Sequence, residues 1–445
     1  MADVQPFVGT HYAEMTEAAL KNRLTPPYDV IDQRLQEDLY QRDPHNFVRV
    51  DLCKGEPSDN EENNRYTRAG TTWRKWKQKG LLIEDHKKSF YVYEQEFSLP
   101  SGDRVRRRGF FGAVRLESFA EGGIRAHEYT FSGPKADRFR LMRATNSQLS
   151  PIFVLFDDPD KKIDRLLRED LDESAPVETE FDGVIQRLWT ISKPQAVEAI
   201  RQVLAPQTLF IADGHHRYET SLMYRDEMRE AFDRHDGNQP YDYAMMYLNN
   251  IHDDGLVILP THRVLCREAL QDVNMEESIE ELKAVFEMSP LHVEPERADQ
   301  EAARLQNELE QAGRKTPSFV MILPQGRGYL MTLKTDVDQL IEDDVPRIIK
   351  ELDVSILHRF IINQTLLGNP EAVLDDQDIQ YIKDATQVLE AMQSTKNAIG
   401  FIMNPTKIEQ VCQVAREGLR MPQKSTYFYP KLVTGLITRD LDSPW

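Results

Sequence analysis

The chain has 445 residues, enough for two or three domains with separate cores, and its 40% hydrophobic and 29% charged residues are typical of a globular protein. Seventy-four acidic residues against 55 basic ones give a net charge of −19, which disfavours broad, sequence-independent binding to nucleic acid. No stretch approaches the roughly 18 uninterrupted apolar residues of a membrane span.

The start of the chain and its cysteines point to the cytoplasm. The first ten residues, MADVQPFVGT, lack the basic and apolar regions of a secretory signal. Cys53, Cys266 and Cys412 lie far apart and form no CxxC pair, which predicts reduced thiols and no zinc ribbon.

The first half of the chain mixes helical and strand patterns. We expect a stiff extended segment at 26–31, a helix at 61–79, and an antiparallel hairpin with strands 90–99 and 104–116 around a turn at Ser101-Gly102-Asp103. The basic cluster at 104–108 is interpreted as the solvated face of this hairpin. A helix at 134–148 follows, and strands are expected at 151–156, 177–181, 184–191 and 208–212, with a helix at 193–203 before the last. Next come a helix at 216–232 and two central strands of the same sheet at 241–250 and 256–260.

The second half changes composition near residue 268. Helices are expected at 275–287 and 296–312, a strand pair at 318–324 and 328–334, and helical structure from 343 to 367. A strand at 398–403, a helix at 406–417 and a loop at 420–432 complete the pattern. Because hairpins imply antiparallel pairs, the class is α+β, a mixed sheet with hairpins and flanking helices. We expect a nucleotide-binding core at 1–267, an α+β insert or second domain at 268–342, and a C-terminal α+β region packing on the core at 343–445.

One stretch specifies both local structure and chemistry: TLFIADGHHRYET, residues 208–220. An apolar strand stops at Asp213-Gly214, and a helix pattern starts at once with His215, His216 and Arg217. Helix N-termini present backbone N–H groups and a positive dipole, and three possible cations there oppose the dipole unless an anion lies among them. A structural turn explains Asp213 and Gly214 but not the three basic residues, so we favour an anion site, most simply for a nucleotide phosphate.

Other segments carry weaker signals. His127-Glu128 lacks the second histidine of a zinc motif, but Glu128 suits a general base or magnesium ligand and His127 a phosphate contact. The rigid Pro26-Pro27 pair is suited to holding Tyr28 and Asp29 against a ligand. Further anion or hydroxyl contacts are expected from two segments, at Thr261, His262 and Arg263 and at Lys424, Ser425, Thr426 and Lys431.

The ordered motifs PPYDVI, NFVRVDL, YVYEQEF, AHEYT, DRFRLMRATN, IADGHHRYET, LPTHR and MPQKSTYFYPK resemble the family called domain of unknown function 1015 from about Pro26 to Gly435. The DGHHR segment alone is similar to the nucleotide-binding motif of the ParB and sulfiredoxin superfamily, which includes kinases of free L-serine. This resemblance implies a ParB/sulfiredoxin-like core, phosphate binding by Gly214, His215, His216 and Arg217, and ATP or ADP with Mg²⁺. Sulfiredoxins carry a cysteine at the position of His215, so their repair chemistry is not expected.

The resemblance therefore implies a nucleotide-dependent kinase for a small hydroxyl metabolite, with free L-serine as the first candidate. Asp29 or Glu128 would accept the hydroxyl proton, His127 would assist, and Tyr28 and Arg138 would contact the substrate. Two alternatives stay open: a non-enzymatic nucleotide-binding regulator, and a metal-dependent hydrolase using His127, Glu128, His215 and His216. The acidic chain shows no helix-turn-helix pattern, so no nucleic-acid partner is expected. The sequence does not fix the oligomeric state or any metal ligands.

Overall fold

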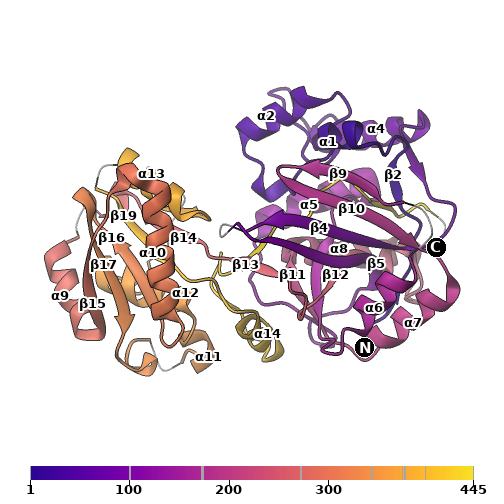
Figure 1. Cartoon of the computed structure of the whole chain (residues 1–445). Helices are drawn as coiled ribbons and strands as arrows, with labels where there is room; N and C mark the ends of the chain where they lie inside the picture. Colours follow the sequence, from indigo (N-terminus) through magenta and orange to yellow (C-terminus); the bar gives the residue numbers. More distant parts are fainter. Residues whose placement is uncertain are drawn as a thin grey trace. The chain divides into compact units, whose positions relative to one another are not determined.

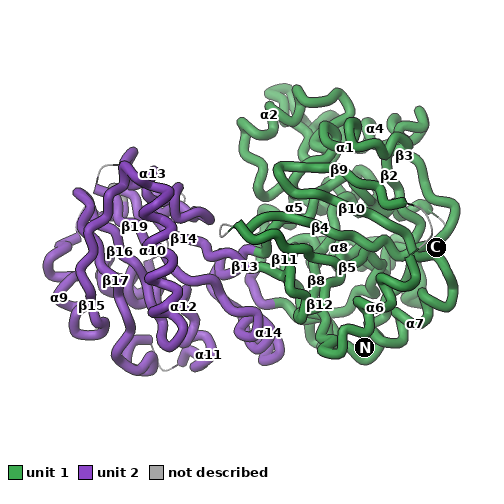
Figure 2. Tube along the Cα trace, in the orientation of Figure 1, with its two compact units in different colours: residues 1–126, 130–257, 428–445 green, residues 127–129, 258–427 purple. Residues whose placement is uncertain are grey.

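The computed structural model describes the chain with short gaps: residues 2–99, 102–171, 175–270, 273–341, 344–372, 374, 377–395, 397–443 and 445. The chain forms two compact units (Figure 2), the first made of residues 1–126, 130–257 and 428–445, and the second of residues 127–129 and 258–427. The predicted division by function at 267/268 and 342/343 stays a prediction, and residues 342 and 343 lie outside the described residues.

The first unit is built on a mixed sheet (Figure 1). Within the described residues this sheet has nine strands in the order β6-β11-β8-β12-β5-β4-β10-β9, with β1 paired to β5. The pairs β11–β6 and β12–β8 are parallel and the other pairs are antiparallel. The α+β class with a mixed sheet and hairpins is therefore confirmed.

The strands of this sheet are β1 (Val4–Gln5), β4 (Phe90–Ser98), β5 (Arg104–Arg115), β6 (Ile124–Arg125), β8 (Ile152–Phe156), β9 (Val177–Phe181), β10 (Val184–Ile191), β11 (Leu209–Asp213) and β12 (Tyr243–Asn250). Three small two-stranded sheets pair β2 (Thr10–Tyr12) with β3 (Leu82–Glu84), β7 (Ser147–Gln148) with β21 (Arg439–Asp440), and β13 (Val257–Leu259) with β20 (Tyr427–Tyr429). The α-helices are α1 (Glu17–Arg23), α2 (Gln33–Arg42), α3 (Val48–Asp51), α4 (Arg65–Gln78), α5 (Ser132–Thr145), α6 (Lys162–Glu169), α7 (Pro194–Leu204) and α8 (His215–Phe232), and short 3₁₀ turns cover Tyr28–Val30 and Pro240–Asp242.

Apolar side chains of the sheet pack against helices α6 and α7. Ile163 and Leu167 of α6, and Ile200 and Leu204 of α7, are buried in one cluster with residues of β4, β5, β8, β11 and β12. Helix α5 packs against both α4 and α8. Helix α4 begins at a capping box in which Asn64 accepts the N–H of Thr67, and this satisfies N–H groups that a helix start leaves unbonded. Helix α8 begins at the candidate site, and α5 contributes Arg138 to it.

The hairpin prediction is confirmed for its two strands, while Ser101 of the predicted turn lies outside the described residues. The interpretation of the basic cluster is wrong at one position. Arg104 and Arg106 are solvated and pair with Glu96, but Arg107 is fully buried and donates to the backbone carbonyls of Tyr429 and Pro430. In a strand, successive side chains point to opposite faces, so a run of four basic residues cannot all face solvent when one face is covered.

A second prediction is also wrong. The segment 256–260 was expected to be a central strand beside 241–250, but β13 is not part of the main sheet and pairs instead with β20. Its residues are only half-buried, whereas all eight residues of β12 are buried. An apolar run alone does not distinguish a central strand from a short connecting one.

The second unit contains a six-stranded sheet among its described residues, in the order β15-β17-β16-β19-β14-β18. Its strands are β14 (His262–Leu265), β15 (Phe286–His292), β16 (Ser318–Ile322), β17 (Arg327–Leu333), β18 (Ile379–Ile382) and β19 (Ile399–Met403). Its α-helices are α9 (Met275–Val285), α10 (Ala298–Gly313), α11 (Arg347–Lys350), α12 (Asp353–Ser355), α13 (Ala385–Ser394) and α14 (Ile408–Arg416), with short 3₁₀ turns at Arg267–Leu270, Pro295–Arg297, Pro324–Gly326 and Val337–Gln339.

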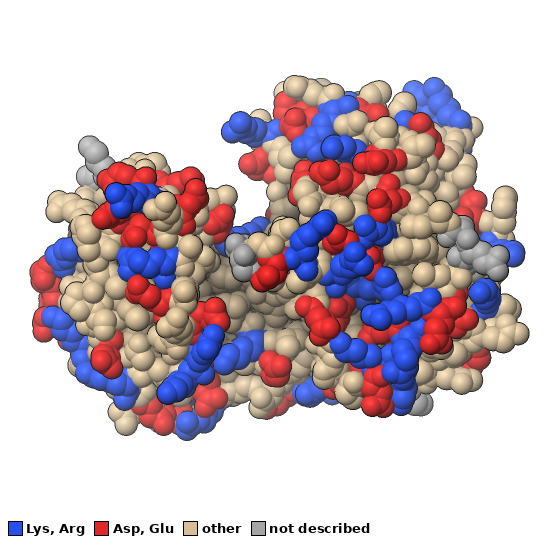
Figure 3. Space-filling view, viewed as in Figure 1, with Lys and Arg blue, Asp and Glu red and all other residues tan. Residues whose placement is uncertain are grey.

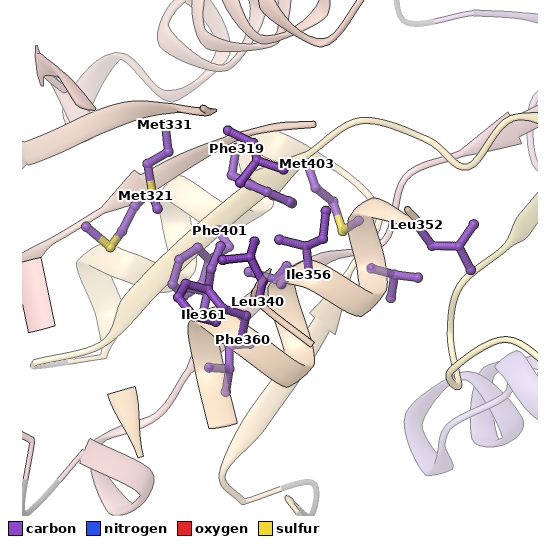
Figure 4. Packing of buried hydrophobic residues seen from close by; sticks show 14 of the residues in the cluster. Phe319, Met321, Met331, Leu340, Leu352, Ile356, Phe360, Ile361, Phe401 and Met403 are labelled. Atoms are coloured by element: carbon purple, nitrogen blue, oxygen red, sulfur yellow. The ribbon is translucent and has the colours of Figure 1, made fainter. Parts of the chain in front are cut away.

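The core of the second unit is made of aromatic, methionine and branched side chains (Figure 4). Phe319 and Phe401 of the sheet pack with Ile356, Phe360 and Ile361. The last three belong to a π-helical segment, Ile356–Leu366, so the helix predicted from 343 is divided into α11, α12 and this segment. Strands β15 and β18 and helix α13 were not predicted, and β15 is mostly exposed, which removes the alternating apolar pattern that reveals a strand.

Charges are mixed over the surface. On the face seen in Figure 3, basic side chains are interspersed with acidic ones. None of the three cysteines forms a disulfide. Throughout the described residues, no helix has the length and apolar character that crossing a membrane requires.

Candidate functional site

The corner at the end of β11 has the predicted form of a strand, a glycine and a helix. Strand β11 ends at Asp213 and helix α8 begins at His215. Gly214 between them has φ 93°, in the left-handed region that residues with a Cβ rarely adopt. A Cβ placed there would lie 3.0 Å from Cζ of Arg217. The first helical bond runs from the N–H of Tyr218 to the carbonyl of Gly214 at 2.9 Å, so the N–H groups before it have no acceptor within the helix.

Asp213 is held by two cations at this corner. Its Oδ2 accepts from Nη2 of Arg217 at 2.9 Å, and its Oδ1 accepts from Nζ of Lys431 at 3.1 Å. Burial raises the pKa of Asp213, but Lys431 and Arg217 outweigh it and hold the pKa below the usual value. Arg217 is buried and also donates to the carbonyl of Pro151. The carboxylate of Asp213 thus provides an anion beside the helix start. The sequence had predicted a bound phosphate as the anion that offsets the basic residues there.

The two histidines have different surroundings. His215 is buried, whereas His216 is half-buried and stacks on Phe131 with ring centroids 6.1 Å apart. Nε2 of His216 accepts the backbone N–H of Phe131 at 2.9 Å, so this nitrogen carries no proton and the remaining proton is on Nδ1. Burial lowers the pKa of His216 and outweighs Glu219 and Asp29, which raise it, while Lys135 lowers it further. His216 is therefore a neutral N–H donor at neutral pH and not one of three cations.

The extended segment before Tyr28 lies beside the same corner. Pro27 has φ −61° and ψ 149°, as expected for a rigid extended residue, and a short 3₁₀ turn follows. Asp29 is exposed. Against the effect of burial, Glu219 and then Asp29 raise the pKa of His216, and Asp213 and then Asp29 raise the pKa of Arg217. Burial raises the pKa of Tyr28 to about 12. The Pro-Pro-Tyr-Asp and Asp-Gly-His-His-Arg segments, 184 residues apart from Asp29 to Asp213, meet in the first unit.

Arg138 joins this group from helix α5. It is buried, its guanidinium lies 4.0 Å from the ring centroid of Tyr28, and it pairs with Asp137 at 2.6 Å and with Asp51 at 3.1 Å. Asp51 ends α3, is buried, and also accepts from Ser150 at 3.2 Å. The sequence interpretation included Arg138 but not Asp51 or Ser150. Asp51 lies within the NFVRVDL motif. A carboxylate directly after the apolar residues of this motif was the sequence feature that could have identified it as a site residue.

The His127-Glu128 pair belongs to the second unit. Glu128 makes a parallel β-bridge with Met421, and its Oε1 accepts the N–H of Lys424 at 3.2 Å. His127 is buried, with Nε2 3.2 Å from Oγ1 of Thr426. These contacts anchor the tripeptide 127–129 to the loop at 421–426. They give His127 and Glu128 a structural role within the second unit.

Thr261, His262, Arg263, Lys424 and Ser425 also belong to the second unit. Arg263 is fully buried; its Nε lies 3.0 Å from Nε2 of His358 and its Nη2 donates to the carbonyl of Lys424. His262 accepts the N–H of Met403 at Nδ1, and burial lowers the pKa of His262 to about 3, with Arg263 acting in the same direction. The side chains of His262 and Arg263 are thus enclosed in the core. Almost none of their surface is accessible to an anion from solvent.

The described residues contain no group of three or more His, Cys, Asp and Glu side chains arranged to hold a metal ion. Of the predicted site residues, Tyr28, Asp29, Arg138 and Asp213 to Arg217 come together in the first unit, and Lys431 joins them from the C-terminal segment. The others lie in the second unit. The candidate site is thus a helix start with an exposed carboxylate, a neutral histidine and two cations that share Asp213.

Comparison with known proteins identifies the family. The sequence matches the model of a family described as protein of unknown function (DUF1015) over residues 4–355. The chain belongs to this family, as its motifs indicated, although the MPQKSTYFYPK motif lies beyond the matched residues. No curated protein matches the sequence.

Several solved structures are similar to parts of the chain. A free serine kinase in complex with AMP is 12% identical with a TM-score of 0.30, covering 69% of this chain and 83% of the kinase. SbnI with a C-terminal truncation, from Staphylococcus aureus, is 10% identical with a TM-score of 0.36, covering 75% and 89%. A conserved hypothetical protein from Pyrococcus furiosus is 12% identical with a TM-score of 0.30, covering 70% and 89%. These TM-scores are too low to support a conclusion about fold or activity. The ParB/sulfiredoxin-like core therefore stays a prediction.

Proposed function

We propose that this protein is a nucleotide-dependent kinase that phosphorylates a small hydroxyl metabolite, with free L-serine as the first candidate. The observation that carries the proposal is the meeting of the Pro26–Asp29 segment with the start of α8. An exposed carboxylate, Asp29, acts there on the charges of His216 and Arg217. A base next to a helix start that suits phosphate is what a phosphoryl transfer requires.

The roles of the residues follow from their charges. The backbone N–H groups after Gly214 would bind phosphate oxygens, and Nδ1–H of His216 would donate to another. Lys431 would neutralise developing charge, because its ammonium lies at the helix start, with Nζ 3.1 Å from Oδ1 of Asp213. Arg217 is committed to Asp213 and Pro151, so its role is to position the helix start.

The chemical step needs no covalent intermediate on the protein. The hydroxyl oxygen of the acceptor would attack the terminal phosphorus, its proton would pass to the carboxylate of Asp29, and the shortened nucleotide would leave. Glu128, the other base considered from sequence, belongs to the second unit. Mg²⁺ would be held largely by the phosphates and water, as is usual for this ion, and the single exposed carboxylate at Asp29 is compatible with that.

The proposal is tested by incubating the protein with Mg²⁺, L-serine and either ATP or ADP and measuring O-phosphoserine by mass spectrometry. Asp29→Asn is expected to lower the rate at least 100-fold with little change in nucleotide affinity, since general base catalysis is worth about 10²–10⁴-fold. Asp32→Asn is the matched control, because Asp32 only caps α2 nearby in sequence. Equal rates in the two variants would show that Asp29 is not the base.

Two other outcomes decide between the alternatives. Nucleotide binding without phosphorylation of serine or other small alcohols would support the regulator instead of the kinase. Stoichiometric zinc in the purified protein would support the hydrolase, whose four residues are divided between the two units.

A further inference from the structure

A cavity of about 40 Å³ lies beside α5 and α8 in the first unit. The residues lining it include Arg138, Ser150, Arg217 and Ser221, with apolar side chains such as Met142 between them. A water molecule needs about 10–15 Å³ of such space, so the cavity has room for roughly three water-sized groups. This volume suits the head of a small metabolite and is too small for a nucleotide base.

One wall of the cavity carries a buried carboxylate with an unused oxygen. Asp51 lines the cavity and is 1% exposed. Its Oδ1 accepts from Arg138 at 3.1 Å and from Ser150 at 3.2 Å. Its Oδ2 has no hydrogen-bond partner among the described residues. Buried polar atoms are nearly always paired, so an unpaired carboxylate oxygen beside a cavity indicates a donor supplied from outside the chain.

Neither of the two arginines that line the cavity donates a hydrogen bond to Oδ2 of Asp51. Arg138 is shared between Asp137 and Asp51, and Arg217 is occupied by Asp213 and the carbonyl of Pro151. Burial raises the pKa of Asp51 in spite of Arg138, which is the expected effect on a carboxylate whose charge is incompletely offset. A ligand with a positive charge and several N–H donors would complete both the charge and the hydrogen bonding.

We propose that this cavity, here called the Asp51 cavity, binds the ammonium group of a small primary amine of the free amino acid class through Oδ2 of Asp51. An ammonium group carries three donors and one positive charge, and a charge-assisted hydrogen bond to a buried carboxylate is stronger than one between neutral groups. The inference rests on the proposed function, because it assigns the amine to the acceptor. It makes Asp51 a residue that determines which hydroxyl compounds are accepted.

The test compares matched ligands on the wild-type protein without nucleotide, using calorimetry. L-serine is paired with L-glycerate and L-alanine with L-lactate, since each pair differs only in an amine replaced by a hydroxyl. The amines are expected to bind at least 10-fold more tightly than their partners. Equal affinity within either pair, or binding of neither amine, overturns the inference.

A variant locates the effect. Asp51→Asn is expected to lower the affinity for L-serine and L-alanine about 10- to 100-fold, since it removes the charge at Oδ2. Asp137→Asn is the control, because it removes the other carboxylate partner of Arg138 but does not line the cavity. Thermal unfolding shows whether each variant is folded. If Asp51→Asn folds and binds L-serine normally, the inference is wrong; if it does not fold, the ligand pairs on the wild type decide alone.

Phosphoryl transfer separates this inference from the proposed function. If L-glycerate is phosphorylated as fast as L-serine, the protein is a kinase of small alcohols and the Asp51 cavity does not select amines. If L-serine binds to the wild type and not to Asp51→Asn, yet no nucleotide yields O-phosphoserine, the cavity is confirmed and the kinase proposal falls.

Discussion

Asp213→Asn is expected to destabilise the first unit more than any exposed charge change, because Arg217 and Lys431 share this carboxylate. Removing one partner of a buried ion pair costs about 3–5 kcal/mol. The Asp213 side chain is 23% exposed, which reduces the expected loss to about 2–4 kcal/mol. The measurement is urea unfolding followed by tryptophan fluorescence, which reports selectively on the first unit since Trp73, Trp76, Trp189 and Trp445 all belong to it.

The pH dependence of this loss has a definite sign. The pKa of Asp213 in the folded protein is lowered by Lys431 and Arg217 against the effect of burial. Its stabilising contribution is therefore complete above the unfolded pKa of about 3.9 and is lost as pH falls through the folded pKa. The difference between wild type and Asp213→Asn should be constant from pH 5 to pH 8 and should narrow below about pH 4.

A control on helix α8, which carries Arg217, isolates the effect of the Asp213–Arg217 ion pair. Asp226 is 59% exposed and pairs with Arg225 at 2.7 Å, so Asp226→Asn is expected to cost no more than about 1 kcal/mol. Equal losses in the two variants, or a difference for Asp213→Asn that does not narrow in acid, would refute the account of this carboxylate as the internal anion of the helix start.

Two further predictions concern the same corner. Gly214→Ala should destabilise the protein by about 1–2 kcal/mol or more and should exceed Gly80→Ala in the same unfolding assay, because both glycines have positive φ but only at Gly214 would the new Cβ meet a neighbour, Arg217. Lys431→Met should weaken ADP binding about 10- to 100-fold in calorimetry, since it removes the ammonium that we propose neutralises phosphate but leaves Asp213 its other cation. A larger loss of stability in Gly80→Ala would contradict the first prediction, and an unchanged ADP affinity in a folded Lys431→Met protein would contradict the second.

The sequence pattern was sufficient to predict the structure where neighbouring residues in the sequence determine a helix, strand or turn. The strand ending at Asp213, the glycine and the helix after it were predicted because apolar run, corner and polar helix lie next to one another in sequence. The hairpin of β4 and β5 followed from alternation for the same reason. The burial of Arg107 was missed because the cover comes from Tyr429 and Pro430, more than 300 residues away, and nothing local indicates it.

The candidate site was predictable in its centre and not in its surroundings. The helix start was predictable because its own residues specify it. The prediction of a phosphate there assumed that the basic residues at the helix start have no anionic partner within the protein. The partner is Asp213, one turn before Arg217, and the neutrality of His216 depends on a contact with Phe131 that only the fold creates. Asp51 reaches the site from a motif near the start of the chain. Long-range pairing of this kind leaves no periodic signal in sequence.

The order of the segments has a consequence for how the protein is made. Residues 428–445 belong to the first unit, and Lys431, which contacts Asp213, is among them. During synthesis the second unit's residues emerge before those that finish the first, so the nascent chain carries the helix start of α8 for some 200 residues without Lys431. A fragment that stops at residue 427 contains both helices of the candidate site and lacks this cation. Nucleotide binding that depends on Lys431 would therefore be acquired only after residue 431 has been translated.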